Sequence, residues 1–219
     1  MARLLFEKTG NAVWISHLDL MRLFQRAFKR AGLPLKHTQG FNPRPSVSIA
    51  MPLSVGVQSR CELLDFELDQ CTVSNEDICS KLNESLVAGV RVLQVYDTGR
   101  KLRDLALLAC QIDLEYDGGA AMAAADRIRL LFSQETIVVV KKSKNGDAEQ
   151  NIVPMIKEIS VTVPNDNTVH LNALICCQNP SLNPMQLVAA IERYSPELKP
   201  DHAVCRRVQL YDANREIFR

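Results

Sequence analysis

Two eight-residue segments of the chain follow the same pattern, and this repeat constrains the fold more than any other feature. Leu93–Arg100 reads LQVYDTGR, and Val208–Arg215 reads VQLYDANR at a spacing of 115 positions (93 to 208). Both segments have the order apolar, Gln, apolar, Tyr, Asp, two variable residues, Arg. Because self-similarity along a chain indicates a repeated structural unit, we expect an internal duplication in which each copy ends with this segment.

The first half of the chain predicts the order strand, helix, strand, strand, helix, strand. The helix should begin at Ser16 and end at Gly32-Leu33-Pro34, since Gly and Pro commonly stop helices. Ser74–Asp77 is a capping pattern that starts a second helix. The expected strands lie at 3–8, at 13–15 after a turn at Gly10–Asn11, and at 47–52, 62–69 and 90–96.

The second half repeats this order. We expect strands at 105–116 and 169–177, helices at 120–132 and 183–194, a strand pair at 136–141 and 152–163 around the turn Asn145–Gly146, and a last strand at 204–211. The predicted fold class is therefore α+β, with two tandem ferredoxin-like (βαββαβ) units whose antiparallel sheets carry helices on one face. The units should cover residues 1–100 and 101–219, with the boundary within 98–104.

Charge is distributed unevenly between the two ends of the chain. Up to residue 60 there are nine Lys and Arg residues and two acidic residues, a net charge of +7. The whole chain has a net charge of +1, so the remainder carries −6. This asymmetry predicts an anionic partner at the N-terminal end.

The helix expected at 16–31 has an apolar side and a basic side when drawn at 100° per residue. The apolar side should pack on the sheet, and it holds Leu20, Leu23, Phe24, Ala27, Phe28 and Ala31. The opposite side carries four cations, namely Arg22, Arg26, Lys29 and Arg30. This row is either an ordinary solvated face or a docking surface for phosphates or an acidic protein.

The start of this helix holds the first candidate catalytic residues. Ser16 fits the N-cap and Asp19 the third helical position, which is a capping box. Capping does not explain His17, which could hold an anion beside the free backbone N–H groups or act as a general acid or base. Asp19 lies too far round the helix to orient His17 directly. Together with His37, which follows the helix, His17 and Asp19 are the candidate catalytic residues.

The segment from Lys36 to Ser48 is the second candidate site. Two prolines on either side of Arg44 restrict the backbone, and Gly40 permits a sharp bend. The segment is either a rigid crossover or a preorganised anion-binding loop built from Lys36, His37, Gln39, Asn42, Arg44 and Ser46. We expect this loop to lie near the first turn of the helix, with His17 between them. No Walker or dinucleotide-binding pattern is present.

The cysteines and the apolar runs limit other classes of function. The seven cysteines have no C-x-x-C and no metal-like spacing, which predicts free thiols in a reducing cytoplasm and no bound metal. No apolar run approaches the roughly 18 residues of a membrane span. We therefore expect a cytoplasmic protein without a membrane partner and without a cofactor of its own.

Four stretches of the chain, within residues 3–69, resemble the radical-SAM-linked proteins. They are SHLDLMR at 16–22, RAGLP at 30–34, QGFNPRP at 39–45, and PLSVGVQS at 52–59 followed by Glu62. The second half is similar only around 152–157, and Thr38 stands where the family usually has Ser. The resemblance implies a domain of unknown function that associates with a radical SAM enzyme and is linked to RNA or ribosome maturation. The chain lacks C-x-x-x-C-x-x-C and so cannot hold the radical SAM cluster itself.

These observations favour a non-catalytic accessory module that presents its basic N-terminal surface to RNA or a ribosome-related partner. The first alternative is a metal-independent RNA-processing or phosphoryl-transfer enzyme that uses His17, His37 and Arg44. The second alternative is a structural protein-interaction domain. Aromatic residues are only 5% of the chain and the RNP strand pattern is absent. We therefore expect contact with the RNA backbone or with structured RNA, and no sequence-specific base stacking.

Overall fold

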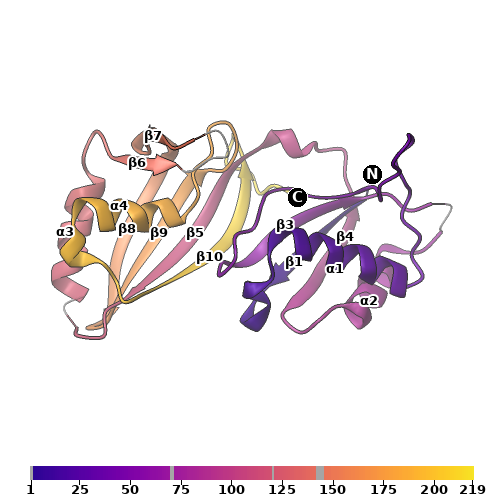
Figure 1. Ribbon diagram of the computed structural model, residues 1–219, viewed down its shortest axis with the longest axis horizontal. Helices are drawn as coiled ribbons and strands as arrows, with labels where there is room; N and C mark the ends of the chain where they lie inside the picture. Colours follow the sequence, from indigo (N-terminus) through magenta and orange to yellow (C-terminus); the bar gives the residue numbers. More distant parts are fainter. Residues whose placement is uncertain (1, 70–71, 120, 142–145) are drawn as a thin grey trace. The chain divides into compact units, whose positions relative to one another are not determined.

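The protein is a mixed α+β structure of antiparallel sheets and, in the described residues, four α-helices (Figure 1). The computed structural model describes residues 2–69, 72–119, 121–141 and 146–219. Its internal contacts divide the chain into two compact units. Unit 1 runs to Leu102 and includes Arg219, and unit 2 is Arg103–Phe218.

Unit 1 contains a four-stranded antiparallel sheet in the order β4-β1-β3-β2. Its elements in chain order are β1 (Ala2–Lys8), a 3-10 helix (Gly10–Trp14), α1 (His17–Arg30), β2 (Val47–Ile49), β3 (Gln58–Phe66), α2 (Asn75–Ser85) and β4 (Val90–Asp97). The two helices contact each other, and α2 also packs on β4. The helical face of the sheet is closed by aromatic pairs, Phe6 with Phe24 and Phe28 with Phe66, at centroid distances of 4.8 and 4.9 Å.

Both helices of unit 1 begin where the sequence predicts, and α1 also ends where it predicts. The Ser16 hydroxyl accepts from the Asp19 amide at 3.2 Å, and the Ser74 hydroxyl accepts from the Asp77 amide at 3.1 Å. Gly32 has a φ of +67°, and the Leu33 amide donates to the Phe28 carbonyl at 2.9 Å. This is the Schellman arrangement, which reverses the chain at the end of α1.

One prediction about unit 1 is wrong. Residues 13–15 do not form a strand, because Gly10–Trp14 coils into a 3-10 helix. The carbonyl of Ile15, which follows this helix, accepts from the buried Lys8 ammonium at 2.8 Å. Strand β3 carries a buried carboxyl group. Asp65 is buried, and it binds the fully buried guanidinium of Arg3 on β1.

In unit 2, four strands pair antiparallel in the order β10-β5-β9-β8, and β6 and β7 form a separate hairpin. Its elements are β5 (Leu105–Glu115), α3 (Ala121–Phe132), β6 (Val138–Lys141), β7 (Ala148–Asn151), β8 (Ile156–Asn165), β9 (Thr168–Cys176), α4 (Met185–Tyr194) and β10 (His202–Asp212). Helix α3 packs against β8, β9 and α4.

The expected pairing of 136–141 with 152–163 is wrong. Strand β6 pairs with β7 at 148–151, and β8 pairs with β9 instead. A 3-10 helix at Val153–Met155 separates β7 from β8, and Pro154 within it has no N–H to donate to a strand ladder. Of the turn predicted at Asn145–Gly146, Asn145 lies outside the described residues.

The repeated segments lie at the end of the last strand of each unit, where that strand pairs with the first strand of the unit. Tyr96 on β4 pairs with Arg3 of the first strand, and Tyr211 on β10 pairs with Leu107 of β5. Numbering the four sheet strands of each unit along the chain, both sheets have the order fourth, first, third, second. A tandem ferredoxin-like duplication stays a prediction that this order supports.

The six cysteines among the described residues form no disulfide bond with one another, and Cys71 lies outside the described residues. Within the same residues no group of three or more His, Cys, Asp or Glu side chains could hold a metal ion. None of the described helices has the length and apolar character needed to cross a membrane.

Candidate functional site

The fold sorts the N-terminal cations into buried, paired and unpaired groups. Arg3 and Lys8 are fully buried, so they cannot contribute to a surface. Arg22 pairs with Asp19 at 2.9 Å, and Lys36 pairs with Glu67 at 3.1 Å. In the part of the chain that the structure describes, the cations left without an ion-pair partner include Arg26, Lys29 and Arg44.

The roll of α1 exposes its basic side, as the sequence predicts. Leu20, Phe24, Ala27 and Phe28 on the opposite side are fully buried against unit 1. The four cations of the row, Arg22, Arg26, Lys29 and Arg30, are exposed. Arg30 is held at the helix end, where its guanidinium donates to the Ser85 carbonyl.

The loop at 36–46 is a narrow, hydrogen-bonded excursion from the sheet. His37 and Pro45 form an isolated bridge, and the Thr38 amide donates to the Arg44 carbonyl at 2.8 Å. The Arg44 amide in turn donates to the Thr38 hydroxyl at 3.0 Å. Gly40 has a φ of +137° at the tip, a conformation that only Gly adopts readily. These hydrogen bonds give the loop a defined conformation, so it is not an extended linker.

The tip of this loop is polar and fully accessible. Gln39, Asn42 and Arg44 are exposed, and the Phe41 side chain is 100% exposed. At the base, the Ser46 amide donates to the Lys36 carbonyl at 2.7 Å, which fixes the two arms of the loop together. An aromatic ring presented in this way is free to contact a partner.

A groove of about 700 Å³ joins the loop to α1, and we call it the basic groove. Arg26 and Lys29 line it from the last two turns of α1, and His37 and Pro45 line it from the loop. The rest of the lining is Gln25, Phe28 and Gly32–Leu35. Its cations are exposed and unpaired, so the groove offers positive charge above an apolar floor.

The position of the loop corrects one expectation. The loop lies against the C-terminal half of α1 and not against its first turn, and His17 is not among the described residues that line the groove. His17 lies nine positions before Arg26, about 13 Å along a helix axis at 1.5 Å per residue. The cause is the chain reversal at Gly32, after which the buried Leu33 and Leu35 anchor the returning chain beside the end of α1.

The other predicted residues lie apart from the groove. The Nδ1 atom of His17 is buried and has no hydrogen-bond partner in the described structure. Asp19 is committed to its helix, because the hydrogen bond from Ser16, followed by that from Arg22, lowers the pKa of its carboxyl group. Ser46 lines a different hollow of about 280 Å³, beside Ser48 and Asp65. The structure therefore brings together Arg26, Lys29 and His37, but not the three catalytic candidates.

Sequence reasoning missed Gln25, Phe28 and Pro45 as parts of this surface. Gln25 lies four residues before Lys29 and so shares its helix face, which the helical period could have indicated. A helical projection places Phe28 in the core. Phe28 also lines the groove because the chain after Gly32 folds back beside the end of α1.

Comparison with known proteins identifies a family and no curated relative. A family model described as "Uncharacterized protein conserved in bacteria (DUF2344)" matches residues 2–184. No curated protein matches the chain.

Two solved structures are similar over most of the chain at low identity. The first, from "Crystal Structure of a Cbf5-Nop10-Gar1 Complex", has a TM-score of 0.49 at 10% identity and covers 95% of this chain and 48% of the other. The chain thus spans about half the length of that protein. The second, an unknown protein from Galdieria sulphuraria, has a TM-score of 0.27 at 11% identity and covers 94% of this chain and 97% of the other.

Proposed function

The chain belongs to the bacterial family DUF2344, and we propose that it is a non-catalytic accessory module that binds RNA through the basic groove of unit 1. The observation that carries the proposal is the pair Arg26 and Lys29. Both are exposed, both line the groove, and neither has an ion-pair partner in the described structure. Lys and Arg side chains in this state bind phosphates by releasing counterions.

The loop favours RNA over an acidic protein as the partner. Single-stranded nucleic acid binds where a cationic surface that follows the backbone is combined with an aromatic ring on which a base can stack. Phe41 is fully exposed at the tip of the same loop that brings His37 to the groove. The combination of a cationic groove and an exposed ring on one loop is the basis for proposing RNA as the partner.

The resemblance to radical-SAM-linked proteins supports a second part of the proposal. The module would work beside a radical SAM enzyme that modifies or matures RNA, and it would supply RNA affinity while that enzyme supplies the cluster and the chemistry. The motifs that carry this resemblance, SHLDLMR and QGFNPRP, lie on α1 and on the loop of the basic groove.

The enzyme alternative receives less support from the geometry. It needs His17, His37 and Arg44 around one phosphodiester, but only His37 lines the groove. The protein-interaction alternative predicts that nuclease treatment leaves a captured partner in place, and the experiment below separates it from RNA binding.

The finer fold assignment also belongs to this proposal. We infer that the two units are duplicated ferredoxin-like folds, with the β6–β7 hairpin as an insertion in the second. The shared strand order supports this, and so does the place of Tyr96 and Tyr211 near the end of the last strand of each unit, where it pairs with the first strand. Superposition of the two units in an experimental structure, with Gln94–Tyr96 on Gln209–Tyr211, would test it.

The test of function is the salt dependence of RNA binding. Fluorescence anisotropy with a labelled 20-nucleotide single-stranded RNA would give the dissociation constant of the wild type and of Arg26→Ala/Lys29→Ala from about 50 to 200 mM salt. Each lost phosphate contact lowers the slope of log K against log salt by about 0.7 for single strands. The double variant should therefore lose about 1.4 from the slope.

The matched control is Lys81→Ala/Lys199→Ala, because these two lysines are also exposed and have no ion-pair partner in the described residues. It makes the same change in net charge and should leave the slope within about 0.3 of the wild type. Equal slopes for all three proteins would remove the basic groove from RNA binding. A partner captured from cell extract that survives nuclease treatment would instead favour the protein-interaction alternative.

A further inference from the structure

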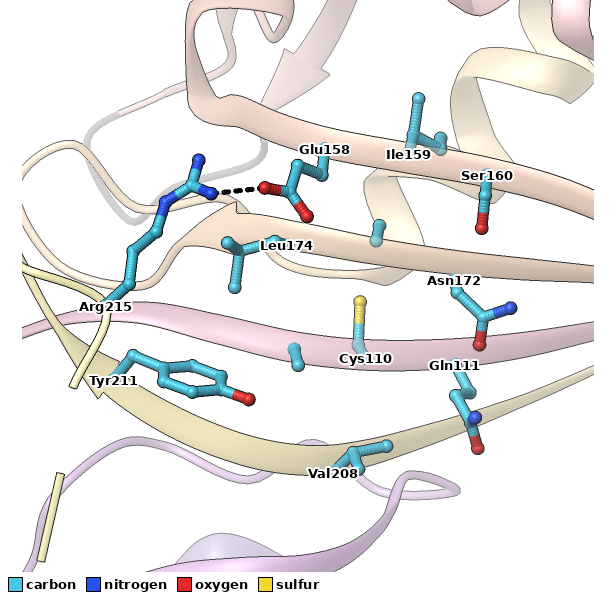
Figure 2. Close-up of a pocket in the computed structure, with 12 residues that line it drawn as sticks. Cys110, Gln111, Glu158, Ile159, Ser160, Asn172, Leu174, Val208, Tyr211 and Arg215 are labelled. Atoms are coloured by element: carbon cyan, nitrogen blue, oxygen red, sulfur yellow. Dashed lines mark hydrogen bonds and ion pairs between the residues drawn. The ribbon is translucent and has the colours of Figure 1, made fainter. Parts of the chain in front are cut away.

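A second cavity lies on the face of the unit 2 sheet that the described helices leave open, and we call it the polar pocket. It has a volume of about 550 Å³ and is lined from β5, β8, β9 and β10 (Figure 2). The residues that alternate with its lining along the strands, such as Ile112 and Leu171, are fully buried. The pocket is therefore the accessible side of an amphipathic sheet.

Three polar side chains form a row across the pocket. Gln111 on β5 pairs directly with Asn172 on β9, and Asn172 pairs directly with Ser160 on β8. Directly paired residues point to the same face at about 5 Å spacing. Tyr211 on β10 adds a ring and a hydroxyl group at the other end of the pocket (Figure 2).

None of these four side chains makes a hydrogen bond to another described residue, and all four line the pocket. Their charged neighbours, in contrast, are already satisfied. Asp113 accepts from His170 at 2.6 Å and also pairs with Arg206, and Glu158 pairs with Arg215. The pocket thus offers uncommitted neutral hydrogen-bonding groups between ion pairs that cancel each other.

This composition selects for an uncharged ligand with donors and acceptors on a planar edge. Each amide presents one acceptor oxygen and two N–H donors, and Asn or Gln can bind the N6 and N7 edge of adenine with two hydrogen bonds. Leu174 and Val208 give an apolar floor, and the Tyr211 ring can stack on a base. The volume falls in the usual range of about 300–1,000 Å³ for small-molecule sites.

We propose that the polar pocket binds an unpaired adenine base, with Gln111 and Asn172 on its hydrogen-bonding edge. The proposal deepens the proposed function and rests on it only for the source of the base, which an RNA would supply. It also revises the expectation that this chain makes no sequence-specific base-stacking contact.

The test is a titration of 15N-labelled protein with adenosine, followed by NMR through the side-chain NH2 signals of Gln111 and Asn172. Adenosine carries no phosphate, so the result does not depend on the basic groove. Both signals should shift with saturation, and Gln111→Ala and Asn172→Ala should each weaken binding at least about 10-fold. Gln134→Ala, an exposed amide that lies just after α3 and outside the pocket, should leave affinity unchanged.

Two further probes separate the base from other ligands. Ribose 5-phosphate and maltose should shift neither amide signal. Equal shifts with either probe would overturn the base site in favour of a sugar or phosphate site. An absence of any shift with adenosine would also overturn the base site. Gln111 is exposed on the sheet surface, so Gln111→Ala should fold normally. This variant therefore still tests the proposal if Asn172→Ala does not fold.

If RNA binding proves independent of Arg26 and Lys29 while adenosine still shifts both amides, the proposed function fails and the base site stands. The opposite result would leave an RNA-binding groove without a base site.

Discussion

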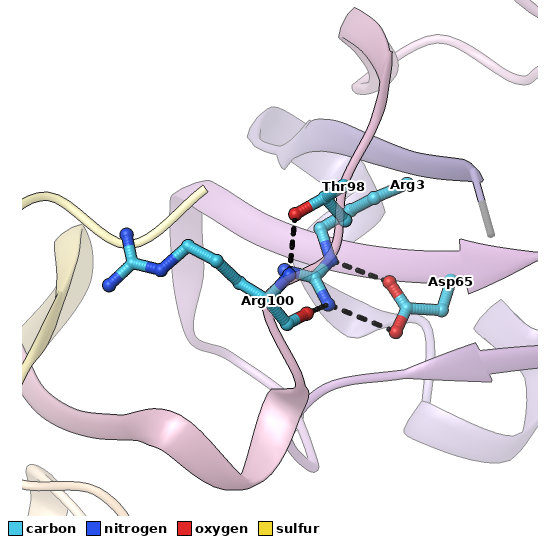
Figure 3. A network of polar contacts seen from close by, with 4 residues as sticks. All are labelled: Arg3, Asp65, Thr98 and Arg100. Atoms are coloured by element: carbon cyan, nitrogen blue, oxygen red, sulfur yellow. Dashed lines mark hydrogen bonds and ion pairs between the residues drawn. The ribbon is translucent and has the colours of Figure 1, made fainter.

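The buried Arg3–Asp65 pair makes a strong prediction about stability (Figure 3). The Arg3 guanidinium is fully buried and binds Asp65 through two hydrogen bonds, from Nε at 2.6 Å and from Nη2 at 3.1 Å. Nη2 also donates to the Arg100 carbonyl at 2.9 Å, and the Arg100 amide donates to the Thr98 hydroxyl. Asp65→Asn keeps the shape of the side chain but removes the charge that balances Arg3.

The magnitude follows from leaving a cation buried without its carboxylate. Removing one partner of a buried pair costs about 3–5 kcal/mol. The remaining amide oxygen can still accept one hydrogen bond, which is worth about 1 kcal/mol. We therefore expect Asp65→Asn to lower the free energy of unfolding of unit 1 by about 3 kcal/mol, a large part of the 5–15 kcal/mol typical of a domain.

The assay is urea unfolding followed by far-UV circular dichroism, with hydrogen exchange of the β1 amides to place the loss in unit 1. Asp69→Asn makes the same chemical change at an exposed site a few residues beyond β3 and should alter stability by less than about 0.5 kcal/mol. The double variant Arg3→Met/Asp65→Leu should recover most of the loss, because it buries no charge. A loss below about 0.5 kcal/mol in Asp65→Asn would refute this reasoning, and a double variant no more stable than Asp65→Asn would assign the loss to packing.

Burial raises the pKa of Tyr116 to about 12, and its hydroxyl donates to the Leu198 carbonyl at 3.0 Å. The neutral phenol stabilises the fold, so its contribution to the free energy of unfolding is complete below pH 10 and is lost as the pH rises to about 12. Tyr116→Phe should lower the free energy of unfolding by about 1 kcal/mol at pH 7 and should reduce the further loss of stability at alkaline pH, as measured by urea titrations. Ser16→Ala and Ser74→Ala should each destabilise unit 1 by about 1 kcal/mol through a lost helix cap, and an unchanged urea midpoint would contradict either. Burial raises the pKa of Cys205 to about 11, so iodoacetamide at pH 8 should modify it in guanidinium but not in the folded protein, as peptide mass spectrometry would show.

The sequence predicts those parts of the fold that depend on local chemistry. The caps at Ser16 and Ser74 and the stop at Gly32 need only neighbouring residues, and the structure has both helices where these signals place them. The exposed basic side of α1 follows from the same helical period. Predictions failed where a distant segment decides the outcome, as for the partner of β6.

Buried charge is the clearest failure of local reasoning. Arg3 and Asp65 are 62 residues apart, and nothing in the residues around either one indicates the other as its partner. Each is buried only because β1 and β3 pair with these two residues in register. The count of N-terminal cations consequently overstated the charge available at the surface, since Arg3 and Lys8 are both buried.

The polar pocket escaped sequence reasoning for the same physical reason. Gln111, Ser160 and Asn172 lie on three different strands, and each alone is an ordinary polar residue on the outer side of a strand. Pairing register places them in one row, and only the structure reveals that their hydrogen-bonding groups are uncommitted while the adjacent charges are paired. The two candidate sites therefore differ in kind. The basic groove has unpaired cations, so RNA binding there should weaken steeply as the salt concentration rises. Adenosine binding in the polar pocket should be nearly insensitive to salt, because no net charge is neutralised there.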